Sequence, residues 1–120
     1  MNSSSTQISR TELHDQLQAG SSFKLVEALP VKYYQEAHLP TALNLPLDRI
    51  DELASSLLPN KDELIVTYCA SDACENSATA AAHLRKLGYC NVREYHEGKA
   101  GWIAAGLPVE TVTKKAEVGA

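Results

Sequence analysis

Residues 64–77 have the sequence LIVTYCASDACENS, and this stretch decides how the rest of the chain is read. Its first five residues form an apolar run with little polar alternation, which is typical of a strand near the centre of a parallel sheet covered by helices. Cys69 ends the run, a short polar loop follows, and residues 77–87 have helical apolar spacing up to Gly88. The stretch therefore predicts a strand, a loop that carries a cysteine, and a helix.

The segments on either side continue this alternation of strands and helices. Ser9 and Glu12 have the spacing of a capping box, which predicts the start of a helix that Gly20 can end. Further strands are expected at 23–27, 42–45 and 91–95, and a short helix is expected around Trp102. Strands that alternate with helices predict an α/β domain with a parallel sheet and right-handed crossovers.

The length and charge of the chain limit its architecture and its partners. With 120 residues we expect one domain at 8–110, a flexible arm at 1–7 and a loose tail at 111–120. The formal net charge of −4 argues against nucleic-acid binding, which normally uses a basic face. No apolar run approaches the ~18 residues of a membrane span, so we expect no membrane partner.

The amino terminus and the cysteines indicate where the protein works. Residues 1–7 are polar and lack the apolar segment of a signal peptide. The three cysteines are an odd number, which argues against a disulfide framework and for a reducing compartment. We therefore expect a cytoplasmic protein.

Cys69 is the candidate nucleophile because of its position between strand and helix. Free amides of a first helical turn, together with the helix dipole, stabilise an anion at this point. A loop whose own amides turn inward adds an anion-binding nest. These effects lower a thiol pKa and also stabilise a negatively charged adduct on the sulfur, such as a persulfide. Glu27, Asn44 and His96 are expected near the same edge of the sheet, because they follow or end the other strands.

The chain resembles single-domain rhodaneses, which are sulfurtransferases, over roughly residues 8–110. HLPTALNLP at 38–46 is similar to the family's His-x-Pro-Gly-Ala-x-Asn-x-Pro segment. Tyr68-Cys69, the loop and residues 80–89 resemble the active-site strand and helix, and 92–109 resembles the closing segment with its tryptophan. The resemblance implies a rhodanese-like α/β fold with a central parallel five-stranded sheet and helices on both faces.

The resemblance also implies a function and a set of site residues. Cys69 would accept a sulfane sulfur from a small-molecule or protein donor, carry it as a persulfide, and pass it to an acceptor thiol. No metal and no organic cofactor are implied. His96 and Glu27 are further candidates at the edge of the sheet. The predicted substrate-binding loop consists of Ala70, Ser71, Asp72, Ala73, Cys74, Glu75, Asn76 and Ser77.

The loop departs from the family pattern Cys-x-x-Gly-x-Arg-Ser in length and charge. Ser77 lies two positions further from Cys69 than in that pattern, and the loop contains neither glycine nor arginine. Asp72 and Glu75 would repel a dianion and oppose a thiolate. We therefore expect thiosulfate to be a poor donor, and a protein or low-molecular-weight persulfide to be the physiological one.

Several alternatives follow from the same residues. Cys74 is either a resolving thiol that forms a disulfide with Cys69 or a side chain that packs under the loop, so a thiol-redox protein is one alternative. The domain is alternatively a non-catalytic rhodanese-like binding or regulatory module. A phosphatase of the Cys-x5-Arg type is disfavoured because position 75 is glutamate. A zinc site is disfavoured by the wide spacing of Cys69 and Cys74.

Overall fold

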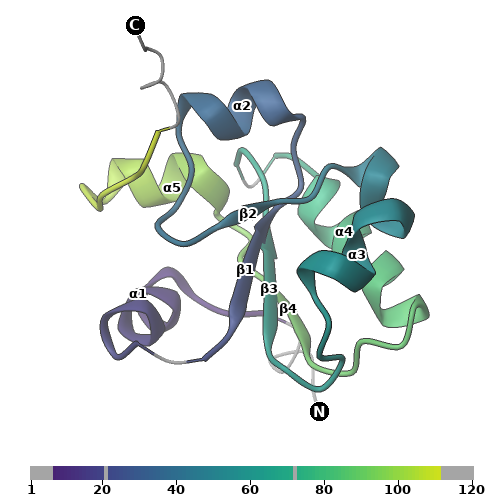
Figure 1. Ribbon diagram of the computed structural model, residues 1–120. Coiled ribbons are helices and arrows are strands. Elements are labelled where there is room, and N and C mark those ends of the chain that lie inside the picture. The colour runs from purple at the N-terminus through teal and green to yellow at the C-terminus, as the bar shows by residue number, and fades with distance from the viewer. Residues whose placement is uncertain (1–6, 21, 72, 112–120) are drawn as a thin grey trace, which may run out of the picture.

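Four parallel strands form the central sheet in the order β2-β1-β3-β4 (Figure 1). The computed structural model describes residues 7–20, 22–71 and 73–111, so nearly all of the predicted arm and tail lies outside the described residues. The strands are β1 (Lys24–Glu27), β2 (Leu43–Asn44), β3 (Ile65–Tyr68) and β4 (Val92–Glu94).

The prediction of a five-stranded sheet is wrong for the described part of the chain. The segment before the first helix contacts β4 through one parallel bridge, between Gln7 and Glu94, and the Ile8 amide donates to the Glu94 carbonyl at 3.1 Å. This pairing does not continue into a strand, because the chain leaves the sheet and begins helix α1 at Arg10. What looks like a fifth strand is therefore a single bridge at the edge.

Helices cover both faces of the sheet, as predicted (Figure 1). In the figure, α1 and α5 lie on one side of the sheet, and α3 and α4 lie on the other. The predicted capping box is confirmed, since Ser9 accepts from the Glu12 amide at 3.1 Å and Glu12 accepts from the Ser9 amide at 3.0 Å. The helices are α1 (Arg10–Gln18), α2 (Val31–Glu36), the 3₁₀ turn η2 (Leu47–Arg49), α3 (Ile50–Leu57), α4 (Asn76–Lys86) and α5 (Gly98–Ala104).

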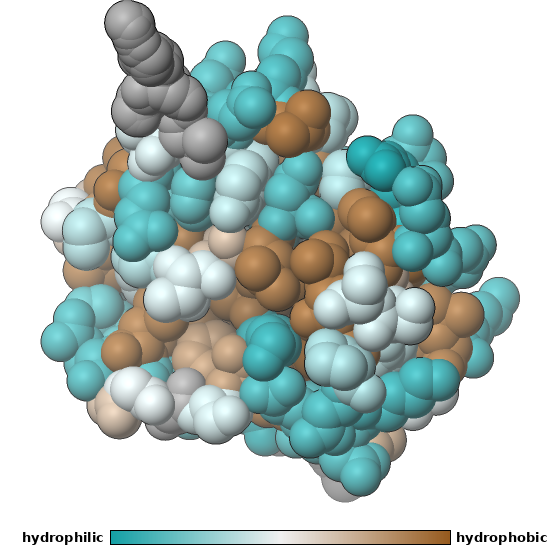
Figure 2. Space-filling model, in the orientation of Figure 1, coloured by the Kyte–Doolittle hydropathy of each residue, from teal (hydrophilic) through white to brown (hydrophobic). Residues whose placement is uncertain are grey.

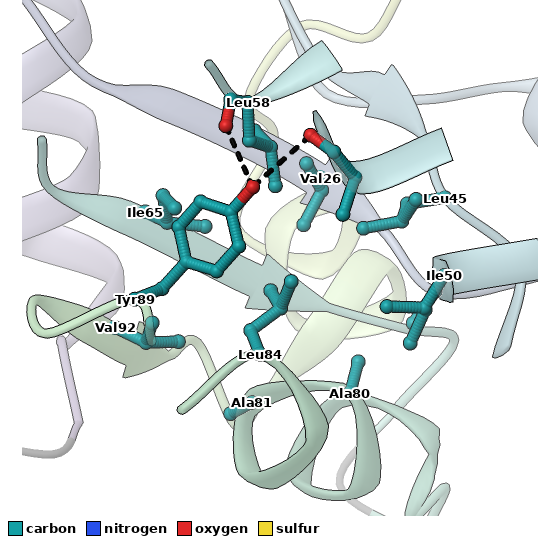
Figure 3. Close-up of a cluster of buried hydrophobic side chains, with 12 residues drawn as sticks. Val26, Leu45, Ile50, Leu58, Ile65, Ala80, Ala81, Leu84, Tyr89 and Val92 are labelled. Carbon is teal, nitrogen blue, oxygen red and sulfur yellow. Dashed lines mark hydrogen bonds between the residues drawn. The ribbon is translucent and has the colours of Figure 1, made fainter. Parts of the chain in front are cut away.

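Two hydrophobic clusters fill the spaces between the sheet and its helices. The cluster on the α3 and α4 side includes Leu84 and Tyr89, and the Tyr89 hydroxyl donates to the carbonyls of Ala54 and Leu58 (Figure 3). The cluster on the other side includes Trp102, which is fully buried. All four residues of β3 are buried between the two clusters, so the strand that leads to Cys69 is held on both faces.

Hydrophobic side chains reach the surface at several places. Figure 2 shows hydrophobic residues reaching the surface across the middle of the viewed face, with hydrophilic residues around them. Large exposed hydrophobic side chains include Val31 and Tyr33 of α2 and Ile103 of α5. No helix within the described residues combines the length and the apolar character needed to cross a membrane.

Candidate active site

Cys69 lies directly after β3 and is fully buried, with 0% of its surface exposed. Successive residues of a strand point to opposite faces, so Cys69 faces the same side as Thr67 and the opposite side from Tyr68. Thr67 fixes this side, because its hydroxyl donates at 2.9 Å to the carbonyl of Ser77 at the start of α4. The thiol is therefore set beneath the amino-terminal turn of α4, as the sequence predicts.

Three polar atoms surround the Cys69 sulfur. The Ser77 amide donates to Sγ at 3.4 Å, while the Cys74 carbonyl at 3.4 Å and the Ser77 hydroxyl oxygen at 3.5 Å can accept its proton. Burial raises the pKa of the Cys69 thiol above its ordinary value, and a hydrogen bond to the Cys74 side chain adds to the rise. These two effects outweigh the contacts with Ser77, which lower the pKa. The predicted lowering of the Cys69 pKa is therefore wrong, because burial of the thiol outweighs the contacts it makes at the start of α4.

Cys74 lies against Cys69 because the loop turns back on itself. The Cys74 amide donates to the Ser71 carbonyl at 3.1 Å, and the Ala73 amide donates to the Ser71 hydroxyl at 3.3 Å. Burial raises the pKa of Cys74, but hydrogen bonds from the Cys69 thiol and from the amides of Asn76 and Ala70 outweigh it. The net effect is a lowered pKa for Cys74.

The loop amides are thus distributed differently from the prediction. We expected the amides of the loop to turn inward around the Cys69 sulfur. In the structure the Ala70 amide serves Cys74, and the amide that reaches Cys69 belongs to Ser77. Asp72, a predicted member of the loop, lies outside the described residues. Glu75 is exposed and is the N-cap residue of α4, where its carboxylate makes no capping hydrogen bond.

The first turn of α5 holds the start of the loop. The amides of Lys99 and Ala100 donate at 2.8 Å to the carbonyls of Cys69 and Ala70. A trans peptide points its C=O and N–H in opposite directions, so these bonds turn the Ala70 amide away from α5 and into the loop. Gly98 allows this approach, since a Cβ there would lie 2.7 Å from the Cys69 carbonyl oxygen.

Glu27 does not join Cys69, although the sequence places both at the same edge of the sheet. Its carboxylate is fully buried and accepts from the Tyr68 hydroxyl at 2.6 Å and from the Lys99 Nζ at 3.1 Å. Glu27 pairs with Tyr68 in the sheet and shares its face, which is opposite to the face of Cys69. The strand ends thus coincide, but the alternation of side chains separates the two residues. Asn44 holds the segment that follows β1, because its side-chain amide donates to the Leu29 carbonyl at 2.8 Å.

Glu94, which we did not predict, connects Cys69 to His96. It is buried in β4, and its carboxylate accepts from the Ser77 hydroxyl at 2.7 Å and lies 3.4 Å from the His96 Nδ1. Glu94 pairs with Thr67 in the sheet and so faces α4 beside Cys69. The signal in the sequence was an acidic residue within a buried strand, which rarely occurs without a partner.

No described set of three or more histidine, cysteine or acidic side chains is placed to hold a metal ion. The site contains two thiols, Cys69 and Cys74, and each has its own hydrogen-bond partners. Hydrogen bonds join Cys69 to Ser77 and Ser77 to Glu94, and the amides of Ala70 and Asn76 donate to Cys74. The chemistry available to it is that of thiols.

The chain is similar to known proteins over most of its length. The model of the rhodanese-like domain family matches residues 9–105. The HTH-type transcriptional regulator Rv0324 of Mycobacterium tuberculosis is 33% identical over 103 residues, which are 86% of this chain and 44% of that protein. The thiosulfate sulfurtransferase PspE of Escherichia coli is 32% identical over 59 residues, which are 49% of this chain and 55% of that protein. The chain spans about half the length of these relatives.

A solved structure supports the fold over most of the chain. The BH2092 protein of Bacillus halodurans superposes with a TM-score of 0.84 at 29% identity, covering 90% of this chain and 78% of that one. The strand, loop and helix around Cys69 lie within the residues that the family model matches. The chain belongs to the rhodanese-like domain family.

Proposed function

We propose that this domain is a sulfurtransferase that carries sulfane sulfur as a persulfide on Cys69. The observation that carries the proposal is the position of this thiol, at the end of the central strand and within hydrogen-bond distance of the Ser77 amide in the first turn of α4. The Cys69 thiol loses its proton and its sulfur attacks the outer sulfur of a donor persulfide, the donor's S–S bond breaks, and the donor leaves as a thiolate. An acceptor thiolate then attacks the outer sulfur on Cys69, breaks the new S–S bond and regenerates the Cys69 thiolate.

Intact-mass measurement after incubation with a small persulfide tests this function. We expect the protein to gain one sulfur atom, and the Cys69→Ser variant to gain none at the loop. Cys90→Ser is the matched control, because Cys90 is exposed and remote from the site. The odd number of cysteines, all of them free thiols, suits a reducing compartment such as the cytoplasm.

The charges around the loop favour a persulfide donor over thiosulfate. The Lys99 ammonium donates to Glu27 and to the Tyr33 carbonyl, so it is already neutralised. Arg10 pairs with Glu97, the N-cap residue of α5. Glu75 of the loop is exposed, and Lys99 and Arg10, the two cations placed at the start of α5, are each paired with a carboxylate.

Thiosulfate turnover is therefore expected to be slow and to rise with ionic strength. Salt screens the repulsion between Glu75 and the thiosulfate dianion. At 0.1 M salt this repulsion extends over about 10 Å. Glu75→Gln should raise the thiosulfate rate and reduce its dependence on salt, while Glu52→Gln, on the remote helix α3, should leave both unchanged. A high thiosulfate rate that falls as salt is added would show that the site attracts the dianion instead.

A second candidate function is a regulatory module, favoured by the likeness to a transcriptional regulator. A module of this kind binds through the rhodanese-like domain without turning over sulfur. The intact-mass experiment separates the two functions, because a module takes up no sulfur from any of several donors. Uptake that depends on Cys69 excludes a purely structural module.

A thiol-redox function is favoured by the contact between the two loop thiols. The lowered pKa of Cys74 gives it thiolate at a lower pH than Cys69, whose pKa is raised. Attack of the Cys74 thiolate on a Cys69 persulfide forms a 69–74 disulfide and releases hydrosulfide, and a cellular dithiol then reduces the disulfide.

Site-resolved alkylation tests the order of these two thiols. As pH rises from acidic values, Cys74 is expected to react with iodoacetamide before Cys69 and before Cys90, whose pKa is raised by its hydrogen bond to Asp62. Peptide mass spectrometry after alkylation at each pH gives the three profiles. If Cys74 reacts no earlier than Cys90, the loop amides do not activate it.

A further inference from the structure

An unbroken hydrogen-bonded chain leads from the buried Cys69 thiol to the surface. It runs from Cys69 Sγ to the Ser77 hydroxyl at 3.5 Å, from that hydroxyl to Glu94 Oε2 at 2.7 Å, and from the same carboxylate oxygen to His96 Nδ1 at 3.4 Å. Ser77 is 1% exposed, and the side chain of Glu94 is 11% exposed. The side chain of His96 is 54% exposed, so the chain ends in solvent.

The Ser77 hydroxyl has one proton, and the distances show where it points. Its 2.7 Å contact with the carboxylate is much shorter than its 3.5 Å contact with sulfur, so the proton lies on the Glu94 side. The oxygen then presents a lone pair to the Cys69 thiol. The other acceptors for the thiol proton are the Cys74 carbonyl and the Cys74 side chain, and the test below is made in a Cys74→Ser background to remove the second thiol. A rotation about the Cβ–Sγ bond moves the proton from one acceptor to another without moving the sulfur.

We propose that Ser77, Glu94 and His96 form the path by which Cys69 loses its proton as it attacks a sulfur donor. The S–H proton passes to the Ser77 oxygen while the Ser77 proton passes to the Glu94 carboxylate, leaving a Cys69 sulfur bonded to the incoming group and a neutral Glu94. Glu94 then returns its proton to water through the His96 imidazole. The path rests on Cys69 as the nucleophile of the proposed function, and Glu94 and His96 are positioning residues that act through Ser77.

The surroundings allow the proton to leave at His96. An open hollow there is lined by Glu12 and Glu97 together with residues 7–9. Glu97 is paired with Arg10, and Glu12 is held by the Ser9 capping box. On the inner side, the groups that face Cys69 are the Cys74 thiol and Ser77. Lys99 donates to Glu27 on the opposite face of the sheet.

Glu94→Gln separates this role from simple electrostatics, because the two predict opposite effects. The amide oxygen of the glutamine still accepts a hydrogen bond from Ser77, but the amide does not take up a proton near neutral pH. If Glu94 only repels negative charge, its neutralisation makes the Cys69 thiolate easier to form and the variant reacts faster. If Glu94 accepts the proton, the variant reacts more slowly at neutral pH.

The experiment is the rate of Cys69 alkylation by iodoacetamide as a function of pH, resolved by peptide mass spectrometry in a Cys74→Ser background. We expect Glu94→Gln to slow the reaction at pH 7 by about a hundredfold and to abolish its solvent deuterium isotope effect. The rates should converge at high pH, where hydroxide removes the thiol proton directly. Exposed Cys90, in the same samples, reports any change in the reagent. Equal or faster reaction of Glu94→Gln at pH 7 would overturn the path.

Further variants keep the test sharp if Glu94→Gln fails to fold. Ser77→Ala should show the same loss, and Ser77→Thr, which restores the hydroxyl, should recover most of the rate. His96→Asn changes an exposed residue and should slow the reaction at pH 7 without altering its high-pH limit; an unchanged profile would remove His96 from the path. Alkylation needs no sulfur transfer. If the variants show the expected alkylation profiles but the protein takes up no sulfur, the proposed function is refuted and the proton path still holds.

Discussion

Gly98→Ala is expected to lower the free energy of unfolding by about 3 kcal/mol. Gly98 has a φ of +70°, a conformation that disfavours a side chain. A Cβ there would also lie 2.7 Å from the Cys69 carbonyl oxygen and 2.8 Å from the Ser71 amide nitrogen. Both atoms belong to the backbone of the loop, so relief of the contact must displace the loop or the start of α5.

This displacement should reach the chemistry as well as the stability. The Lys99 amide holds the Cys69 carbonyl at 2.8 Å, and a shift of α5 by an ångström breaks that bond. We expect sulfur uptake by folded Gly98→Ala protein to slow by roughly a hundredfold, the usual cost of such a misplacement. Urea denaturation measures the stability, and the rate of mass gain measures the uptake.

Gly106→Ala is the matched control for Gly98→Ala. Gly106 has a similar φ of +77°, but a Cβ there meets no atom within 4 Å. It should therefore cost only the conformational part, about 1 kcal/mol, and should leave sulfur uptake unchanged. Equal losses in the two variants would show that the contact between Gly98 and the loop does not constrain the site.

Lys99→Met is expected to lower the free energy of unfolding by about 3–5 kcal/mol, because it leaves a buried charge without its partner. The Glu27 carboxylate is fully buried, and the Lys99 side chain is 13% exposed. Removal of the ammonium leaves the Tyr68 hydroxyl as the remaining donor to that carboxylate. Urea denaturation at pH 7 measures the loss.

Two variants calibrate this result. Lys24→Met breaks the partly exposed pair between Lys24 and Glu63 and should cost less than about 1 kcal/mol. The double variant Glu27→Gln/Lys99→Met removes both charges and should recover most of the stability lost in Lys99→Met. A cost for Lys99→Met no larger than that of Lys24→Met would mean that the buried pair contributes little.

Local patterns in the sequence were enough to predict the scaffold around the site. The unbroken apolar run before Cys69 predicts a central strand, and β3 is buried along its whole length. The Ser9 and Glu12 spacing predicts the start of α1, and both capping bonds are present. The parallel sheet and its helical layers follow from the alternation of elements, because parallel strands require crossovers that cover the sheet.

The details of the site depended on side-chain direction and on contacts between distant segments. Glu27 and Cys69 end neighbouring strands, but a difference of one residue in register puts them on opposite faces. Glu94 escaped prediction because its partner, Ser77, is 17 positions away along the chain. The Cys74 sulfur lies among the loop amides because the chain turns back at Ser71. The residue types of the loop did not predict this turn.

The most direct test of the central claim is transfer of a labelled sulfur through Cys69. The protein is loaded with a persulfide that contains a heavy sulfur isotope, separated from the donor, and mixed with an excess of acceptor thiol. We predict one labelled sulfur on the Cys69 peptide before mixing and the same label in the acceptor persulfide afterwards, with Cys74→Ser competent and Cys69→Ser inactive. A label that resides on Cys74, or that reaches the acceptor equally well in Cys69→Ser, would contradict the account.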